Sequence, residues 1–313
     1  MSEDRRHVPV LPHEVLAYLC VRPGARYVDG TLGDGGHTQL LLEADPTLEV
    51  LGVDRDSVTL AATAARLAAF GTRLRVQRGT FDRIGEALAA VGWDAVDGLL
   101  LDLGISSRQL DDPARGFSFQ ASGPLDMRMT QGEGPSAADL LATLDERAIA
   151  ELLWRYGDEP ASRRIARAIV AERAKAPIAD TGALADLVAR VAPRRGSLHP
   201  ATRVFQALRI VVNSELDHLE AFLGRVLEWL RPRARLVVIA YHSLEDRRVK
   251  QAFQAWAASC RCPPALPRCG CGARARVRIL TRKVVTPSDA EVRANRRARS
   301  ARLRALETLE TAA

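Results

Sequence analysis

The chain has 313 residues, with 45 Lys and Arg against 38 Asp and Glu, and a formal net charge of +7. This length suits one large α/β domain or a core domain that carries a second one. No apolar run approaches the roughly 20 residues that span a bilayer, which excludes an integral membrane protein. The opening residues lack the apolar stretch of a secretory signal, so we expect a cytoplasmic protein.

Strand-like runs alternate with helical patterns at the start of the chain. The runs cover residues 25–28, 50–53, 74–77 and 96–101, and a fifth covers 236–240. Helical patterns at 58–70 and 84–91 lie between the early runs. This alternation predicts a parallel, doubly wound α/β sheet, in which ligands bind beyond the carboxyl ends of the strands.

The alternation stops after the fourth run. Residues 104–235 are too many for one crossover helix and contain no convincing strand. A polar, Gly-rich loop at 111–135 precedes helical patterns at 136–156, 161–175 and 182–191. We therefore expect a core domain in residues 1–109 and 211–313, with an all-helical domain inserted at 110–210. Residues 202–230 also have helical spacing and are predicted to pack against the sheet.

The first run leads into a glycine-rich turn, Tyr27–His37 (YVDGTLGDGGH). Glycines allow a ligand to approach the backbone closely, and the following helix would present free N–H groups. A dinucleotide fingerprint needs a third glycine where this chain has Thr38, so the pyrophosphate motif fails. Asp29 and Asp34 suit a cationic ligand such as S-adenosylmethionine better than a diphosphate. The alternative is a purely structural turn.

Carboxylates also follow the second and fourth runs. Asp54 comes some 20 residues after the glycines, where nucleotide-binding α/β folds hold ribose hydroxyls. Asp102 ends the apolar run Gly98–Leu101 and is expected to point into the ligand crevice. Phe81, after the third run, could stack beside an adenine or belong to the core.

The chain resembles the RsmH (MraW) family, the bacterial cytosine N4-methyltransferases of small-subunit ribosomal RNA, over nearly its full length. The stretches that carry the resemblance are His7–Leu11, Asp29–His37, Leu101–Asp112, Arg115–Phe119, Leu125–Met129, Ala201–Asn213, Tyr241–Arg247 and Arg296–Ser300. The resemblance implies a Rossmann-like class I methyltransferase sheet with an inserted helical domain that helps to hold RNA. It implies S-adenosylmethionine as the methyl donor.

The resemblance also implies the site residues and the substrate. The matching cofactor positions are Gly35, Gly36, His37, Asp54, Phe81, Asp102 and Gln109. The implied substrate is a cytidine in the decoding centre of 16S ribosomal RNA, within the 30S subunit. The alternative function is a methyltransferase that acts on another RNA or on a protein amino group. The chain could also form a homodimer.

Two residues are candidates for the catalytic step. Asp102 is expected to orient the amino acceptor, and His242, after the fifth run, could relay a proton because its unperturbed pKa is near neutral. Many amino-methyltransferases have a proline-rich motif at this strand end, where this chain has Asp102–Ile105 (DLGI). Cytosine C5 chemistry needs a thiol nucleophile, and no cysteine follows a strand at the expected crevice.

Four of the five cysteines are Cys260, Cys262, Cys269 and Cys271. They could hold one structural Zn²⁺ as a Cys₄ site, although the C-x-C spacing is tighter than the common C-x-x-C. Reduced thiols or a labile disulfide are the alternatives. No catalytic metal is expected.

Positive charge is concentrated near the C-terminus. Residues 261–313 hold 13 Lys and Arg and four Asp and Glu, and six arginines lie between Arg293 and Arg304. We predict a helix there that contacts nucleic-acid phosphates, with a solvated helix as the alternative. A nicotinamide oxidoreductase and a non-catalytic RNA-binding scaffold are the remaining classes. The oxidoreductase would need the third glycine that this chain lacks. The RNA-binding scaffold would leave the carboxylates at the strand ends unexplained.

Overall fold

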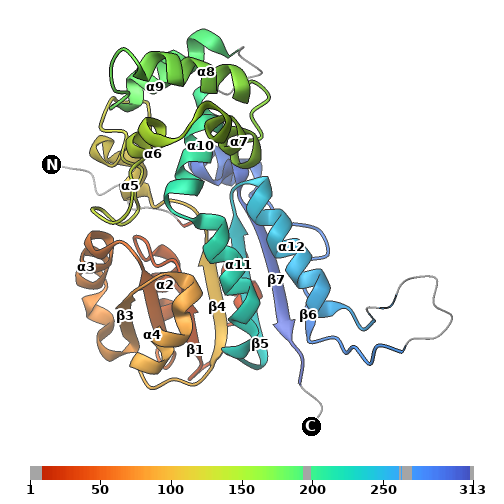
Figure 1. Ribbon diagram of the computed structural model, residues 1–313. Coiled ribbons are helices and arrows are strands. Elements are labelled where there is room, and N and C mark those ends of the chain that lie inside the picture. Colours follow the sequence, from red (N-terminus) through yellow and green to blue (C-terminus); the bar gives the residue numbers. More distant parts are fainter. Residues whose placement is uncertain (1–8, 193–198, 261, 263–269, 311–313) are drawn as a thin grey trace. The chain divides into compact units, whose positions relative to one another are not determined.

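The computed structural model describes residues 9–192, 199–260, 262 and 270–310 (Figure 1). The chain divides into two compact units. Unit 1 comprises Met1–Gly104 and Asp217–Ala313, and unit 2 comprises Ile105–Leu216. Unit 2 therefore extends a few residues beyond each end of the helical domain expected at 110–210. Within the described ranges, no helix combines the length and the apolar character needed to cross a bilayer.

Unit 1 is built on a seven-stranded sheet. Its strands are β1 (Arg26–Asp29), β2 (Glu49–Asp54), β3 (Leu74–Arg78), β4 (Val96–Asp102), β5 (Leu230–Ala240), β6 (Val277–Ile279) and β7 (Arg302–Thr308). They lie in the order β3-β2-β1-β4-β5-β7-β6, and Figure 1 shows β7 beside β5. The strands from β3 to β5 are parallel, whereas β7 is antiparallel to both its neighbours. The predicted doubly wound parallel sheet is confirmed.

Helices bury both faces of this sheet. The helices of unit 1 are α1 (Pro12–Leu19), α2 (Gly36–Ala44), α3 (Ser57–Arg66), α4 (Ile84–Ala90), most of α11 (Glu215–Arg225), α12 (Ser243–Ala257) and α13 (Asp289–Ala294), with the 3₁₀ turns η1 (Ala68–Arg73), η2 (Phe81–Arg83), η4 (Val226–Glu228) and η5 (Arg296–Ser300). Val28 and Leu99 join one core with α4, α11 and α12, whereas Tyr27 and Leu100 join another with α1 and α2. Successive strand residues point to opposite faces, which explains why the central strands are almost continuously apolar.

The topology places β1 at a switch point. The chain moves from β1 to β2 on one side and returns to β4 on the other side of β1. Asp29, Asp54 and Asp102 end these three parallel strands. The carboxyl ends of parallel strands meet at one edge of the sheet, and a switch point there opens a crevice for ligands.

Unit 2 is helical and has its own core. Its helices are α5 (Ser107–Asp111), α6 (Ala137–Thr143), α7 (Glu146–Gly157), α8 (Ser162–Arg173), α9 (Thr181–Val191) and α10 (Ala201–Val212), with the 3₁₀ turn η3 (Pro113–Arg115). Leu153, Ile169, Leu184 and Leu208 are fully buried together in one cluster. Side-chain caps start several of these helices; for example, Asp145 accepts from the Ala148 N–H at 2.7 Å.

The prediction that residues 202–230 pack as one helical segment against the sheet is wrong for its first half. Phe205 and Leu208 of α10 belong to the core of unit 2, whereas Leu219 and Phe222 of α11 belong to a core of unit 1. The segment is interrupted at Ser214, which has a left-handed φ of 49°. Helical periodicity continues across this break, so the pattern alone did not reveal that the two halves serve different cores.

The prediction of a helix from Arg293 to Arg304 is also wrong. The stretch contains the end of α13, then η5, and then the first part of β7. Within β7, Leu303 and Ala305 share one buried face, while Arg304 lies between them and pairs with Asp246 of α12 at 2.6 Å. This two-residue alternation is typical of a strand, and the abundance of arginine obscured it.

Candidate functional site

The glycine-rich turn joins β1 to α2, and its backbone requires glycine. Gly33 and Gly35 have left-handed φ angles of 49° and 71°. A Cβ atom on Gly35 would lie only 2.6 Å from Thr63 Cγ2 and 2.9 Å from Leu67 Cδ1. The turn can therefore follow this path only with glycine at position 35.

Asp54 braces the same turn from the end of β2. Its Oδ2 accepts a hydrogen bond from the Gly33 N–H at 2.8 Å, and its Oδ1 accepts one from the Asp56 N–H at 2.9 Å. Burial raises the pKa of Asp54 from its usual 3.8 to about 6. Additional hydrogen-bond donors would offset that burial cost, and a pair of ribose hydroxyls would supply them.

Asp29 ties the turn to α2. This buried carboxylate accepts a hydrogen bond from the Thr38 hydroxyl at 2.8 Å and a longer one from the Thr31 N–H at 3.3 Å. Burial raises the pKa of Asp29. Because its oxygens face the protein's own donors, Asp29 orients the turn.

Asp102 connects three strand ends. Its backbone N–H donates to Thr31 Oγ1 at 2.6 Å, and its Oδ1 accepts a hydrogen bond from the Tyr241 hydroxyl at 2.8 Å. Thr31 follows β1, and Tyr241 follows β5. Burial and the neighbouring Asp102 raise the pKa of Tyr241 far above its usual value, so its hydroxyl stays a donor. Asp102 is thus held at the crevice edge from both sides.

His37 lies on α2 beside this carboxylate. Its side chain is 6% exposed, and neither ring nitrogen has a hydrogen-bond partner among the described residues. Its Nε2 lies 3.7 Å from Asp102 Oδ2, which is too long for a hydrogen bond. Buried polar atoms are rarely left unpaired, so these nitrogens indicate a place where a ligand or water binds.

Phe81 contributes to packing at the end of β3. Its ring makes edge contacts with Phe222 and His218, at centroid distances of 5.8 and 6.3 Å. The side chain is half-buried. One edge of the ring is therefore used by the core, and contact with the cofactor stays a prediction.

Gln109 belongs to unit 2. It is buried and forms a capping box with Ser106: the Ser106 N–H donates to Gln109 Oε1 at 3.1 Å, and the Gln109 N–H donates to Ser106 Oγ at 3.2 Å. These bonds start α5. A role of Gln109 in cofactor binding stays a prediction.

His242 precedes α12, and its ring lies beside the Glu245 carboxylate of that helix. Its Nε2 lies 3.2 Å from Glu245 Oε1, and both side chains are buried. Glu245 Oε2 also accepts a hydrogen bond from the Tyr241 N–H at 2.8 Å. The hydrogen bond between Tyr241 and Glu245 orients the start of α12. Neither contact tests a proton relay, so that role of His242 stays a prediction.

The structure thus brings Gly35, His37, Asp54 and Asp102 to one edge of the sheet. Sequence reasoning missed the threonines that connect them. Thr63 of α3 donates to the Gly33 carbonyl at 2.7 Å, the Thr38 hydroxyl donates to the Asp29 carboxylate, and Thr31 Oγ1 accepts from the Asp102 backbone N–H. Thr31 and Thr38 were visible as polar residues within and just after the glycine motif, whereas nothing in the sequence pointed to Thr63.

The fold and this site define a class. A topological switch point, a glycine turn at a helix start and carboxylates on adjacent strand ends are typical of Rossmann-like α/β proteins that bind a nucleoside-containing cofactor. The family model described as the MraW methylase family matches residues 4–309. The chain therefore belongs to the MraW methylase family, and its sheet is that of the class I methyltransferases.

Curated relatives agree over nearly the full length. The chain is 52% identical over 305 residues to a protein of Thermomicrobium roseum, covering 97% of this chain and 94% of that protein. It is 51% identical to proteins of Anaeromyxobacter sp. (strain K) and Geobacter sulfurreducens, covering 100% and 99% of their lengths and 99% and 97% of this chain. All three are named ribosomal RNA small subunit methyltransferase H. A solved rRNA methylase from Streptococcus thermophilus is 11% identical, with a TM-score of 0.42, over 95% of this chain and 96% of that chain.

Proposed function

We propose that the chain transfers a methyl group from S-adenosylmethionine to the N4 amino group of a cytidine in the decoding centre of 16S ribosomal RNA. One observation carries the proposal: the glycine turn, Asp54 and Asp102 are joined by hydrogen bonds at a single edge of the sheet. Membership in a methylase family supports the reaction class. The names of the relatives support ribosomal RNA as the substrate.

The residues present fit this cofactor. The buried ring nitrogens of His37 have no hydrogen-bond partner among the described residues, and burial raises the pKa of Asp54. We assign the glycine turn and the start of α2 to the methionine part and Asp54 to the ribose hydroxyls. When bound, S-adenosylmethionine supplies an electrophilic methyl group on a sulfonium.

We assign Asp102 to binding the cytosine amino group, which receives the methyl group. A carboxylate oxygen can accept a hydrogen bond from one N–H of the cytosine amino group and thereby hold the nitrogen in line for attack. Tyr241 holds the other oxygen at 2.8 Å, which limits rotation of the carboxylate. After methyl transfer, the amino nitrogen of the cytosine carries one proton more than the neutral product. His242 is the candidate that passes this proton toward Glu245, 3.2 Å away.

The RNA contacts are assigned to unit 2 and to exposed arginines before β7. Arg293, Arg296 and Arg299 are exposed, whereas Arg304 is engaged with Asp246. A cluster of exposed guanidinium groups favours phosphate binding. We propose the 30S subunit in the cytoplasm as the setting for the reaction, and a homodimer stays a prediction.

The test is to map methylated nucleotides in ribosomal RNA. Small subunits from cells that lack the gene should lack N4-methylcytidine at one decoding-centre position, and the purified chain with S-adenosylmethionine should restore it. Mass spectrometry of nuclease fragments locates the modification. Methyl groups found on a different RNA or on a protein amino group, with the cytidine unmodified, would replace this substrate with the alternative one.

A further inference from the structure

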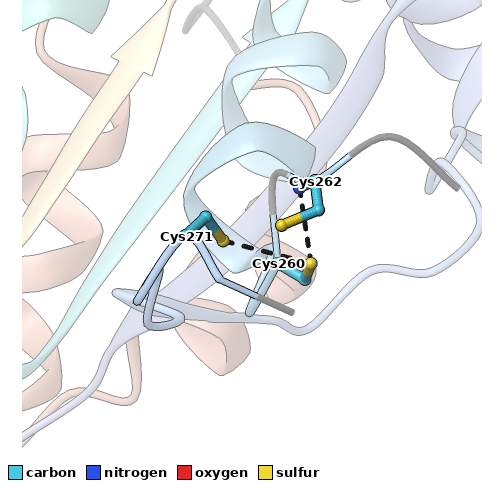
Figure 2. A group of neighbouring side chains, drawn as sticks. All are labelled: Cys260, Cys262 and Cys271. Carbon is cyan, nitrogen blue, oxygen red and sulfur yellow. Dashed lines mark hydrogen bonds between the residues drawn. The ribbon is translucent and has the colours of Figure 1, made fainter. Parts of the chain in front are cut away.

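A cluster of three cysteines lies outside the strand-end site. Cys260 and Cys262 follow α12, and Cys271 lies on the segment that leads toward β6 (Figure 2). The Sγ atoms of Cys260 and Cys271 are 4.0 Å apart, and all three Sγ atoms lie within 4.8 Å of one another. Figure 2 shows the Cys271 side chain on one stretch of chain and those of Cys260 and Cys262 on the other, with the sulfur of Cys271 turned toward them.

The spacing of the sulfur atoms fits coordination to one metal ion. Zinc–thiolate bonds are about 2.3 Å long, so two sulfurs of a tetrahedral site lie about 3.8 Å apart. A disulfide would need about 2.05 Å. The 4.0 Å between Cys260 and Cys271 is therefore close to the tetrahedral value and far from that of a disulfide.

The local backbone supports thiolate at this place. The Cys262 N–H points to Cys260 Sγ, with 3.4 Å between nitrogen and sulfur. A hydrogen bond from the backbone favours the charged form of a sulfur ligand and orients it. Three thiolates this close repel one another, and a divalent cation between them removes the repulsion.

The position of the cluster indicates a structural role. The 15 residues of α12 begin next to Tyr241 and His242 and extend about 22 Å before the cluster is reached. Beyond α12, the Arg276 N–H donates to the Trp256 carbonyl at 2.8 Å, and the Leu309 N–H donates to the Arg276 carbonyl at 2.9 Å. These bonds already join the end of α12 to the strands at the sheet edge, and Cys260, Cys262 and Cys271 lie in the loop that the Trp256–Arg276 bond closes.

We propose that Cys260, Cys262 and Cys271 bind one Zn²⁺ as thiolates and that the ion fastens the end of α12 to the segment leading into β6. On binding, each thiol releases its proton to solvent and donates a sulfur lone pair to zinc, without any change of oxidation state. Cys269 lies outside the described residues, so the proposal rests on the three other cysteines. This site is independent of methyl transfer, because no group in the crevice belongs to it.

The experiment measures the metal directly. The full chain is purified without chelators, under reducing conditions, and zinc is quantified by mass spectrometry. We expect about one zinc per chain in the wild type and less than about 0.2 in each of Cys260→Ser, Cys262→Ser and Cys271→Ser. The matched control is Cys20→Ser, at the end of α1, which should keep the wild-type content. Cys269 is left unchanged in every variant.

A second measurement does not depend on how the variants fold. Replacing zinc by Co²⁺ in the wild type should give the intense near-ultraviolet charge-transfer bands of cobalt–thiolate bonds together with the visible bands of tetrahedral cobalt. Titration of S-adenosylmethionine then checks that each serine variant still has a working crevice. A wild type that takes up neither zinc nor Co²⁺ after reduction and reconstitution would overturn the proposal. So would serine variants that hold as much zinc as the wild type.

Discussion

The hydroxyl of Tyr241, at the end of β5, donates a hydrogen bond to Asp102 Oδ1, at the end of β4, with 2.8 Å between the oxygens. Burial and the adjacent carboxylate raise the pKa of the phenol, so the hydroxyl keeps its proton at neutral pH and stays a donor. The backbone of Asp102 is held independently by Thr31, after β1. The carboxylate that we assign to the amino acceptor is therefore positioned by both neighbouring strands.

Removing that hydroxyl should slow methyl transfer. Hydrogen bonds to charged groups contribute about 1.5–3 kcal/mol, so Tyr241→Phe should lower kcat about 10- to 100-fold if the bond orients the carboxylate. The Kd for S-adenosylmethionine should change less than about threefold, because Asp54 and the glycine turn stay intact. Tyr18→Phe, on α1, is the control. Wild-type kcat in Tyr241→Phe would show that the bond is dispensable.

Cofactor affinity should depend on the protonation of Asp54. The pKa of this carboxyl is about 6 without ligand, above the unfolded value of 3.8, so the stabilisation from the raised pKa is complete below about pH 4 and is lost as pH rises through 6. Ribose hydroxyls prefer the ionised form. The Kd for S-adenosylmethionine should therefore rise up to about tenfold for each pH unit below 6. Calorimetric titration from pH 5 to 7 measures this, and Asp54→Asn should bind weakly with a flatter profile.

A methyl group at Gly35 should destabilise the turn. Gly35→Ala combines a left-handed φ with close contacts to Thr63 and Leu67, and we expect about 2–3 kcal/mol of lost stability. Gly24 is the matched control, because its φ is 68° but a Cβ there meets nothing within 4 Å. Gly24→Ala should cost only about 1 kcal/mol. If chemical denaturation showed equal losses of stability in the two variants, the close contacts with Thr63 and Leu67 would be unimportant.

Asn213 should be essential to the stability of unit 2. Its buried amide donates to the Met127 carbonyl at 2.8 Å and accepts from the Met129 N–H at 2.7 Å. Met127 has a left-handed φ of 62°, so this loop needs external support. Asn213→Ala should cost about 3 kcal/mol and speed hydrogen exchange at residues 125–129.

Ser214, the residue after Asn213, provides a control for Asn213→Ala. Ser214 has a left-handed φ of 49°, which glycine adopts more readily. Ser214→Gly should therefore leave stability unchanged or raise it by up to about 1 kcal/mol. Slow exchange at 125–129 in Asn213→Ala would rule out the anchoring role.

The exposed arginines before β7 should contribute to RNA affinity through counterion release. Replacing Arg296 and Arg299 together by Ala should reduce the slope of log affinity against log salt by roughly 1.4, if each contacts one phosphate of a single strand. Arg83 and Arg225, each paired with the glutamate three residues further along the chain, are the control pair. Filter binding from 50 to 300 mM salt measures the slope. An unchanged slope would remove these residues from the RNA surface.

Much of unit 1 could be predicted because its strands leave few alternatives. A buried run such as Leu99–Leu101, bounded by Gly98 and Asp102, is too short for a helix and too apolar for a loop. The switch-point carboxylates then followed from topology alone. By contrast, β6 has only three residues, and its place beside β7 depends on pairing between segments that are distant in sequence. Local pattern does not encode such pairing.

The errors had physical causes of the same kind. The long pattern at 202–230 kept its helical period across Ser214, although the two halves bury their apolar faces in different cores. Arg304 was taken as a phosphate contact, whereas its ion pair with Asp246 needs α12 to lie against β7. Within the site, Asp54 and Asp102 were predictable as strand ends, but the hydrogen bonds that orient them come from Gly33, Thr31 and Tyr241.

The most direct test of the account is equilibrium binding of S-adenosylmethionine to the wild type, Asp54→Asn and Asp102→Asn, measured by calorimetry at pH 7.5. If the ends of β1, β2 and β4 form one cofactor site, the wild type binds one equivalent and Asp54→Asn binds at least about tenfold more weakly. Asp102→Asn then retains measurable binding but transfers no methyl group. A wild type that binds NAD instead, or an Asp54→Asn variant that binds S-adenosylmethionine as tightly as the wild type, would contradict it.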